Sequence, residues 1–284
     1  MIKFSHHNHS TFSDGKDSLE DMIEYAIENG FTHYVVSDHI FDELCPNDSL
    51  NIKDYDRYIE TIEELKEKHK HKIQIYSGIE TEWYLGGTTG NTGFELLKDR
   101  LDFVVGSVHY MRVREVDYSI DYHKEEFEKC LNVGYLGDIR AMVQDYFRAV
   151  VEMACYIRPS IIAHIDIIQK NNANGRYFLG NEDWLLDIYE NLASFIAKED
   201  FICEVNGGGH YRYEEVGMYP SPTLMSYFLK YGVKMTVGLD AHGKDMLTSY
   251  YDESLRYLSE NGYDEVYYYD NAEWKCEKID RLCL

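Results

Sequence analysis

The chain has 284 residues, of which 44% are hydrophobic and 28% are charged. Its 26 Tyr, 12 Phe and 3 Trp exclude an intrinsically disordered chain, and no apolar run approaches the roughly 18 residues that a membrane span requires. The 51 acidic and 28 basic residues give a net charge of −23. Such a surface repels a phosphate backbone, which argues against sequence-independent nucleic-acid binding.

The cysteines indicate the compartment. All six are spread along the chain without a CxxC pair, so we expect reduced thiols in a cytoplasmic protein. The first six residues contain no apolar stretch, and we therefore expect no signal peptide. No shift in composition and no long linker divides the sequence. We expect a single domain over residues 1–284, and the sequence indicates no particular oligomeric state.

Strand-like and helix-like segments alternate along the whole chain. Short β-branched or aromatic segments that end in polar residues predict strands at 2–10, 32–39, 72–80, 102–110, 160–168, 201–207 and 233–242, with a less regular one at 264–270. Amphipathic segments predict helices at 18–29, 138–157, 183–198, 222–231 and 251–261. In the first helix, Asp17 or Ser18 supplies the N-cap and Gly30 follows the end.

This alternation predicts parallel strands joined by right-handed crossovers. We expect a distorted (β/α)7-type barrel rather than an open sheet, because the polar residues concentrate at the ends of the strands, where βα barrels carry their chemistry. The glycine-rich stretch 86–93 is expected to form a loop over the barrel mouth.

Histidines mark the carboxyl ends of the predicted strands. Six of the twelve lie there: His7, His9, His39, His109, His164 and His242. The third strand ends in Glu80 instead. Because the carboxyl ends of barrel strands meet at one rim, we expect these side chains to gather in space.

The spacing of these residues predicts a metal site. His7 and His9 share one face of their strand, as do Asp240 and His242, and Asp14 adds an oxygen ligand. Imidazole and carboxylate together suit Zn, Mn or Fe. One ion cannot use nine ligands, so we expect two or three divalent ions bridged by Glu80 or Asp240. The nine candidates are His7, His9, Asp14, His39, Glu80, His109, His164, Asp240 and His242.

Each candidate also has a structural alternative. A histidine pair on a strand often forms hydrogen bonds only, Glu80 could cap the following helix, and Asp14 could close the turn at Gly15. We expect Asp38 to orient the neighbouring imidazole rather than to bind metal itself.

The order of these motifs resembles the polymerase and histidinol phosphatase (PHP) superfamily. The matching residues are His7/His9, Asp14, Asp38-His39, Glu80, His109, His164 and Asp240/His242, which span nearly the whole chain. The resemblance implies a distorted seven-stranded (β/α) barrel that holds three divalent metals and acts as a phosphoesterase.

Within this superfamily the chain is most similar to the histidinol-phosphate phosphatases. The similar stretches are 102–109, 163–166, 204–206, 219–222, 238–242 and 264–269, whereas 110–114 and 207–209 depart from the family pattern. The similarity implies hydrolysis of L-histidinol phosphate to L-histidinol and phosphate in histidine biosynthesis. It also implies phosphate-binding roles for Arg212 and Lys170, with Arg176 as a further candidate.

Phosphomonoester hydrolysis needs a nucleophile and neutralisation of charge. We expect attack by a hydroxide that bridges two metals, with Asp240 or His242 donating a proton to the leaving alkoxide. The cationic amine and the imidazole of the substrate are expected to meet acidic or aromatic loop residues. The candidates are Glu43, Glu82, Trp83, Tyr110 and Glu115.

Three alternatives stay open at this stage. The first keeps the family but changes the substrate to another small phosphorylated metabolite or a nucleotide. The second is a metal-dependent amidohydrolase, which typically needs a mid-barrel lysine that the fourth predicted strand lacks. The third is a non-catalytic metal-binding barrel, from which we would expect some ligands to be missing.

Overall fold

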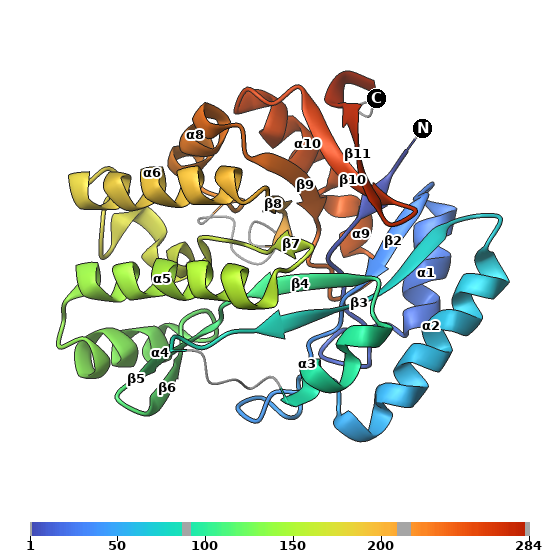
Figure 1. The fold of residues 1–284 in the computed structure, drawn as a ribbon, viewed down its shortest axis with the longest axis horizontal. Helices are drawn as coiled ribbons and strands as arrows, with labels where there is room; N and C mark the ends of the chain where they lie inside the picture. Colours follow the sequence, from blue (N-terminus) through green and yellow to red (C-terminus); the bar gives the residue numbers. More distant parts are fainter. Residues whose placement is uncertain (1, 87–91, 209–216, 282–284) are drawn as a thin grey trace.

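The computed structural model describes residues 2–86, 92–208 and 217–281 (Figure 1). Seven parallel strands form one sheet in the order β1-β2-β3-β4-β7-β8-β9. Their bounds are Phe4–Ser5 (β1), His33–Val36 (β2), Gln74–Glu82 (β3), Phe103–Ser107 (β4), Ile161–Ile162 (β7), Ile202–Asn206 (β8) and Lys234–Gly238 (β9).

The sheet curls so that its first and last strands meet. Just beyond β1 and β9, the backbone N–H of Asp240 donates to the carbonyl of His7 (2.8 Å), and that of His9 donates to the carbonyl of Ala241 (2.9 Å). These bonds close the sheet into a nearly complete barrel. The predicted fold class, a seven-stranded α/β barrel, is therefore confirmed.

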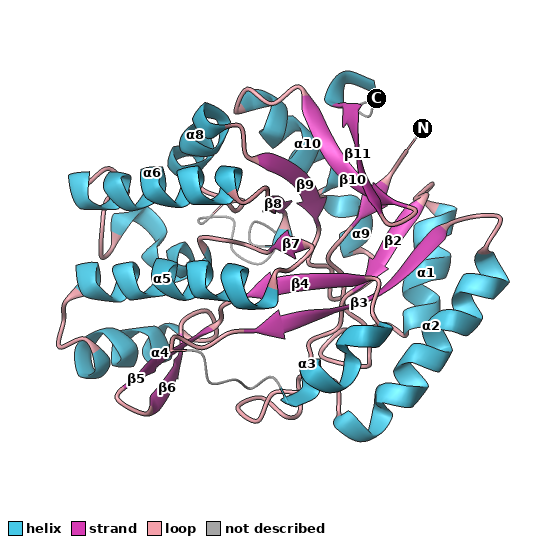
Figure 2. Ribbon diagram, in the orientation of Figure 1, coloured by secondary structure: helices cyan, strands magenta, loops and turns pink. Residues whose placement is uncertain are grey.

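Helices pack around the strands, with α1 and α2 on one side and α5, α6 and α8 on the other (Figure 2). Their bounds are Leu19–Glu28 (α1), Tyr55–His69 (α2), Thr92–Leu97 (α3), Lys124–Lys129 (α4), Ile139–Ile157 (α5), Asp183–Lys198 (α6), Pro222–Tyr231 (α8), Met246–Ser249 (α9) and Tyr251–Glu260 (α10). The 3-10 segments are Ile52–Asp54, Lys98–Arg100, Ile167–Gly175 and Ile279–Arg281, and Cys130–Gly134 is a short π-helix. No helix in these described ranges is long and apolar enough to span a membrane.

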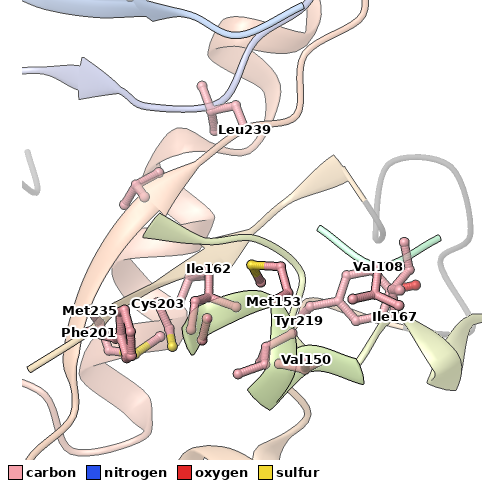
Figure 3. Packing of buried hydrophobic residues seen from close by; sticks show 14 of the residues in the cluster. Val108, Val150, Met153, Ile162, Ile167, Phe201, Cys203, Tyr219, Met235 and Leu239 are labelled. Atoms are coloured by element: carbon pink, nitrogen blue, oxygen red, sulfur yellow. The ribbon is translucent and has the colours of Figure 1, made fainter. Parts of the chain in front are cut away.

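The predicted helices form because their apolar stripes face the strands. Ser18 caps α1 as expected, its hydroxyl accepting the backbone N–H of Asp21 at 3.1 Å. On the other side of the barrel, Val150 and Met153 of α5 pack in the same buried cluster as Ile162 of β7 (Figure 3). This packing anchors the strand ends that carry the polar residues.

Along the inward face of the strands, where every second residue points, the side chains change from apolar at one end of the barrel to polar at the other. On β4, Phe103 and Val105 join a buried apolar cluster near the start of the strands. Two residues further along the same face, the Ser107 hydroxyl donates to the carboxylate of Glu80 on β3. The inner side chains thus change from hydrocarbon to ligand type within a few residues.

A two-stranded hairpin covers the apolar end. β10 (Glu265–Asp270) pairs antiparallel with β11 (Glu273–Lys278), and the side chains of Tyr267, Tyr269 and Trp274 pack on that apolar cluster. The backbone N–H of Tyr269 donates to Nε2 of His6 at 3.2 Å. The predicted segment 264–270 is therefore a strand, although it lies outside the barrel sheet.

Several predicted strands are shorter than expected: the first covers only Phe4–Ser5 of 2–10, and the seventh only Lys234–Gly238 of 233–242. Two others are cut short by a change in the path of the chain. The fourth ends at Ser107, and the chain continues into an antiparallel hairpin of β5 (Tyr110–Val113) and β6 (Val116–Ser119). The fifth covers only Ile161–Ile162, because the backbone turns at His164, whose φ is +20°. Both departures occur where residues of the polar end leave the sheet.

Asp102, at the start of β4, provides a test of the packing far from the polar end. Its carboxylate accepts hydrogen bonds from the backbone N–H of Ser77 (3.0 Å) and from Nζ of Lys66 (2.7 Å). Burial alone would raise the pKa of Asp102, but these partners outweigh it and lower the pKa below its usual value.

We expect Asp102→Asn to lower the free energy of unfolding at pH 7 by about 1 kcal/mol, a small value because the carboxylate is partly solvated. The pKa of Asp102 is lower in the folded state than in the unfolded state. Its contribution to stability is therefore complete above the unfolded-state pKa of about 3.9 and is lost as the pH falls through the folded-state pKa. Urea unfolding of both proteins in chelator from pH 7 to pH 3.5 measures this. A difference that does not shrink with acidification would contradict the assignment. Asp56→Asn, which alters an exposed ion pair with Arg100, is the control.

Candidate metal centre

The nine predicted ligands lie together at the carboxyl ends of the barrel strands. Eight of them form three overlapping groups in which one ligand atom from each member lies within 4.8 Å of the others: His9, Asp14, His39 and His242; His7, His9 and Asp240; and His7, Glu80 and His164. The ninth, His109, places its Nε2 3.2 Å from Nε2 of His164 and 3.5 Å from Oε1 of Glu80. The expected gathering of these side chains is therefore observed.

Several buried ligand atoms in this cluster have no hydrogen-bond partner. They include Nε2 of His7, both ring nitrogens of His9, and Oε2 of Glu80. The Glu80 oxygen lies 3.1 Å from Nε2 of His7 and 3.4 Å from Nε2 of His9, without hydrogen-bond geometry to either. Burying such atoms without a partner is costly. The arrangement therefore fits divalent metal ions, and a set of imidazoles and carboxylates suits Zn, Mn or Fe.

The electrostatics of the cluster reflect its crowded charges. Burial favours the neutral forms, but the carboxylates of Glu204, Glu80 and Asp240 raise the pKa of His7 well above its usual value. Conversely, the surrounding histidines outweigh burial and lower the pKa of Glu80. Burial and the neighbouring His242 and His39 lower the pKa of His9 to about 3. The cluster thus combines anionic carboxylates with imidazoles, and His9 presents a neutral ring to a cation.

Two buried carboxylates that are not among the nine predicted metal ligands, Glu82 and Glu204, contact the imidazoles of predicted ligands. Oε2 of Glu82 lies 2.5 Å from Nδ1 of His109, and its Oε1 accepts the His109 backbone N–H at 2.7 Å. Glu204 on β8 contacts Nδ1 of His7 through both oxygens at 3.1 Å. Carboxylates in this position fix the tautomer and the orientation of ligand histidines. The sequence prediction missed Glu204, although its place two residues before Asn206 on an inward face was a usable signal.

Asp38 has a different role from the one we expected. Its carboxylate accepts hydrogen bonds from the backbone N–H of Ser10 (2.7 Å) and from the hydroxyl of Ser13 (2.7 Å). It therefore fixes the turn that follows β1 and presents Asp14, rather than orienting the imidazole of His39. The reason is geometric, because successive residues of a strand point to opposite sides.

The backbone at Asp240 is strained. Its φ of +51° lies in the left-handed region, which residues other than glycine rarely adopt. Strain of this kind persists where the surrounding structure enforces it, and it is concentrated at functional sites. The conformation brings Oδ1 of Asp240 to 3.4 Å from Nε2 of His9 and 3.3 Å from Nδ1 of His242.

A cavity of about 420 Å³ opens above the cluster. The predicted substrate residues Lys170, Glu82 and Tyr110 line it. Asp42 and Asp121, which the sequence analysis did not single out, line it as well. The cavity therefore carries both acidic side chains and the cations Lys16 and Lys170.

The other predicted substrate residues lie elsewhere. Arg176 borders a separate hollow with Asn171 and Asn174. Glu43, Trp83 and Glu115 are not among the described residues that line the cavity above the cluster. Trp83 is buried and stacks on Tyr156 instead. Arg212 falls outside the described residues, as does most of the glycine-rich stretch 86–93.

The model of the PHP domain matches residues 5–208, which is most of the chain, and the protein therefore belongs to the PHP family. This confirms the family that the order of the motifs indicates.

Two curated relatives are similar over most of their length. One is a "Probable histidinol-phosphatase" of Schizosaccharomyces pombe, 26% identical over 282 residues that cover 92% of this chain and 87% of the relative. Another is the histidinol-phosphatase of Bacillus subtilis, 22% identical over 85% of this chain and 94% of the relative. The solved histidinol phosphate phosphatase of Lactococcus lactis, in complex with Zn, L-histidinol and phosphate, superimposes with a TM-score of 0.65. It is 18% identical and covers 97% of this chain and 100% of that one, which shows a shared fold.

We expect Glu80→Gln to lower the metal content of the protein. Oε2 of Glu80 lies at the centre of the cluster, and an amide there offers a cation no negative charge. After loading with Zn²⁺ and dialysis, mass spectrometry of the metals should find at least one ion per chain fewer than in the wild type. Glu63→Gln on the exposed face of α2 is the matched control. Equal metal content in all three proteins would show that Glu80 is not a ligand.

Proposed function

We propose that this protein is a metal-dependent phosphomonoesterase that hydrolyses L-histidinol phosphate to L-histidinol and phosphate, a reaction of cytoplasmic histidine biosynthesis. The observation that carries the proposal is the cluster of buried imidazoles and carboxylates at the open end of the barrel, in which several ligand atoms, among them Nε2 of His7 and Oε2 of Glu80, lack hydrogen-bond partners. The names of the curated relatives agree with this substrate.

The nine clustered side chains would hold the ions. Two of the three groups consist of buried residues only, whereas Asp14, His39 and His242 are more exposed. Two or three divalent ions suit three overlapping groups. When bound, such ions activate water and neutralise negative charge on a phosphoryl group.

A hydrogen bond just beyond β9 supports different roles for the two candidate catalytic residues, Asp240 and His242. Nδ1 of His242 lies 2.9 Å from the carbonyl oxygen of Asp240. Since a carbonyl only accepts, Nδ1 carries the proton and Nε2 keeps its lone pair for a metal. The Asp240 carboxylate is then the better proton carrier. It takes the proton that the attacking water loses and passes it to the departing alkoxide.

The cavity matches a substrate that carries both signs of charge. Lys170 reaches into it with Nζ 3.8 Å from Oδ2 of Asp121, and it would bind phosphoryl oxygens beside the cluster. Asp42, which also lines the cavity, favours an ammonium or imidazolium group. A phosphomonoester of a cationic alcohol suits a cavity lined by both signs of charge better than the phosphate ester of a neutral sugar does.

We expect Lys170→Met to lower kcat/KM about 10- to 100-fold, since a hydrogen bond to a charged group contributes about 1.5–3 kcal/mol. The loss should occur with the metal content unchanged. Arg176→Met is the matched control because its side chain borders the separate hollow, and it should retain wild-type kcat/KM. If both variants behave like the wild type, Lys170 does not contact the phosphoryl group.

Steady-state phosphate release from a panel of phosphomonoesters tests the activity itself. The metal-loaded protein should prefer L-histidinol phosphate over sugar phosphates and mononucleotides by at least tenfold in kcat/KM. A preference for another member of the panel would support phosphomonoesterase activity but would contradict L-histidinol phosphate as the substrate. Absence of phosphate release from every compound, with metals bound, would favour a non-catalytic metal-binding barrel.

A further inference from the structure

Glu204 occupies a position from which it cannot touch substrate. It lies in the middle of β8, its side chain is fully buried, and it is not among the described residues that line the cavity. A carboxylate buried this deeply is costly unless donors or cations surround it. Its contacts therefore indicate what it does.

All the donors around Glu204 lead to the metal centre. Its two oxygens each lie 3.1 Å from Nδ1 of His7, and Oε1 also accepts the backbone N–H of His164 at 2.9 Å and Nδ2 of Asn206 at 2.7 Å. His7 and His164 belong to one candidate ligand group, that of Glu80. One carboxylate thus connects two ligands that are separated by more than half of the chain.

The neighbouring strand leaves room for this carboxylate. A Cβ atom at Gly238 on β9 would lie 1.8 Å from Oε2 of Glu204 and 2.6 Å from its Cδ. Any side chain at this position would displace the carboxylate. Two independent observations therefore indicate the same position for Glu204: Gly238 has no side chain there, and His7 and His164, just beyond β1 and β7, form hydrogen bonds with the carboxylate.

We propose that Glu204 is a positioning residue for the metal centre, which holds His7 in the tautomer with the proton on Nδ1 and anchors the backbone of His164. Because a carboxylate only accepts, Nδ1 of His7 must be the donor. A cation that replaces the second ring proton then meets the lone pair of Nε2, which faces the space between Glu80 and Asp240. The inference rests on the proposed function only in that it requires the cluster to bind metal.

Replacement by glutamine shows why the acceptor matters. Glutamine has one acceptor oxygen and one NH₂ donor, whereas Glu204 accepts from three donors. If the oxygen keeps the N–H of His164, the NH₂ group faces Nδ1 of His7. That ring must then move its proton to Nε2 or rotate, and either change removes a lone pair from the metal site.

The test measures metal affinity rather than turnover. Metal-free wild type, Glu204→Gln and Glu204→Asp are titrated with Zn²⁺ against a chromophoric chelator, and the thermal unfolding of each metal-free protein is recorded. We expect Glu204→Gln to bind Zn²⁺ 10- to 100-fold more weakly. Glu204→Asp keeps a carboxylate acceptor, but its side chain is one methylene shorter and places that acceptor farther from His7. We therefore expect its loss of Zn²⁺ affinity to be smaller than that of Glu204→Gln. It also replaces Glu204→Gln as the decisive variant if the latter does not fold.

Asp166→Asn is the matched control. Asp166 is equally buried and accepts a backbone N–H, that of Ser221 at 2.8 Å, but it contacts no ligand in the three groups. This variant should lose thermal stability and retain Zn²⁺ affinity within about threefold. Equal affinities of the wild type and both Glu204 variants would overturn the positioning role, as would an equal loss in Asp166→Asn. A wild type that binds no Zn²⁺, Mn²⁺ or Fe²⁺ would instead overturn the proposed function.

Discussion

The structure depends on the enclosure of charged groups at one end of the barrel. Glu80 is almost fully buried and lies within 3.1–3.5 Å of ring nitrogens from five histidines: His7, His9, His39, His109 and His164. Hydrocarbon side chains could not occupy this region without leaving the carboxylate uncompensated. The strands therefore carry apolar residues at the other end, where the β10–β11 hairpin excludes water, and reserve the open end for groups that bind cations.

Strand periodicity made much of this arrangement predictable. A polar residue at the carboxyl end of a barrel strand has few places to point, so histidines at five strand ends and a glutamate at a sixth indicated a common site. His7 and His9 share a face because they are two residues apart, and the structure places both beside Asp240. The barrel followed from the regular alternation of segments. These inferences needed only local spacing and one rule about where strands end.

Other features depended on information that local spacing does not contain. The turn at His164 uses a positive φ at a residue that is not glycine, so the sequence suggested a longer strand. The hairpin after Ser107 has the same β-branched and aromatic composition as the strand before it. Asp38 was assigned to its neighbour in sequence, although its partners Ser10 and Ser13 lie on another loop. Glu204 resembled an ordinary strand residue until the donors around it were known.

The seam between β1 and β9 has a consequence for how the protein matures. His7 and His9 are synthesised more than 200 residues before Asp240 and His242. The same backbone bonds that close the barrel bring the two pairs together. Contacts of such long sequence separation form late, because a long loop must be ordered before they contribute. A nascent or truncated chain that lacks β9 can therefore assemble only the Glu80 group in full. Complete occupancy of the centre consequently reports that the barrel has closed, and cation capture and the final folding step favour each other.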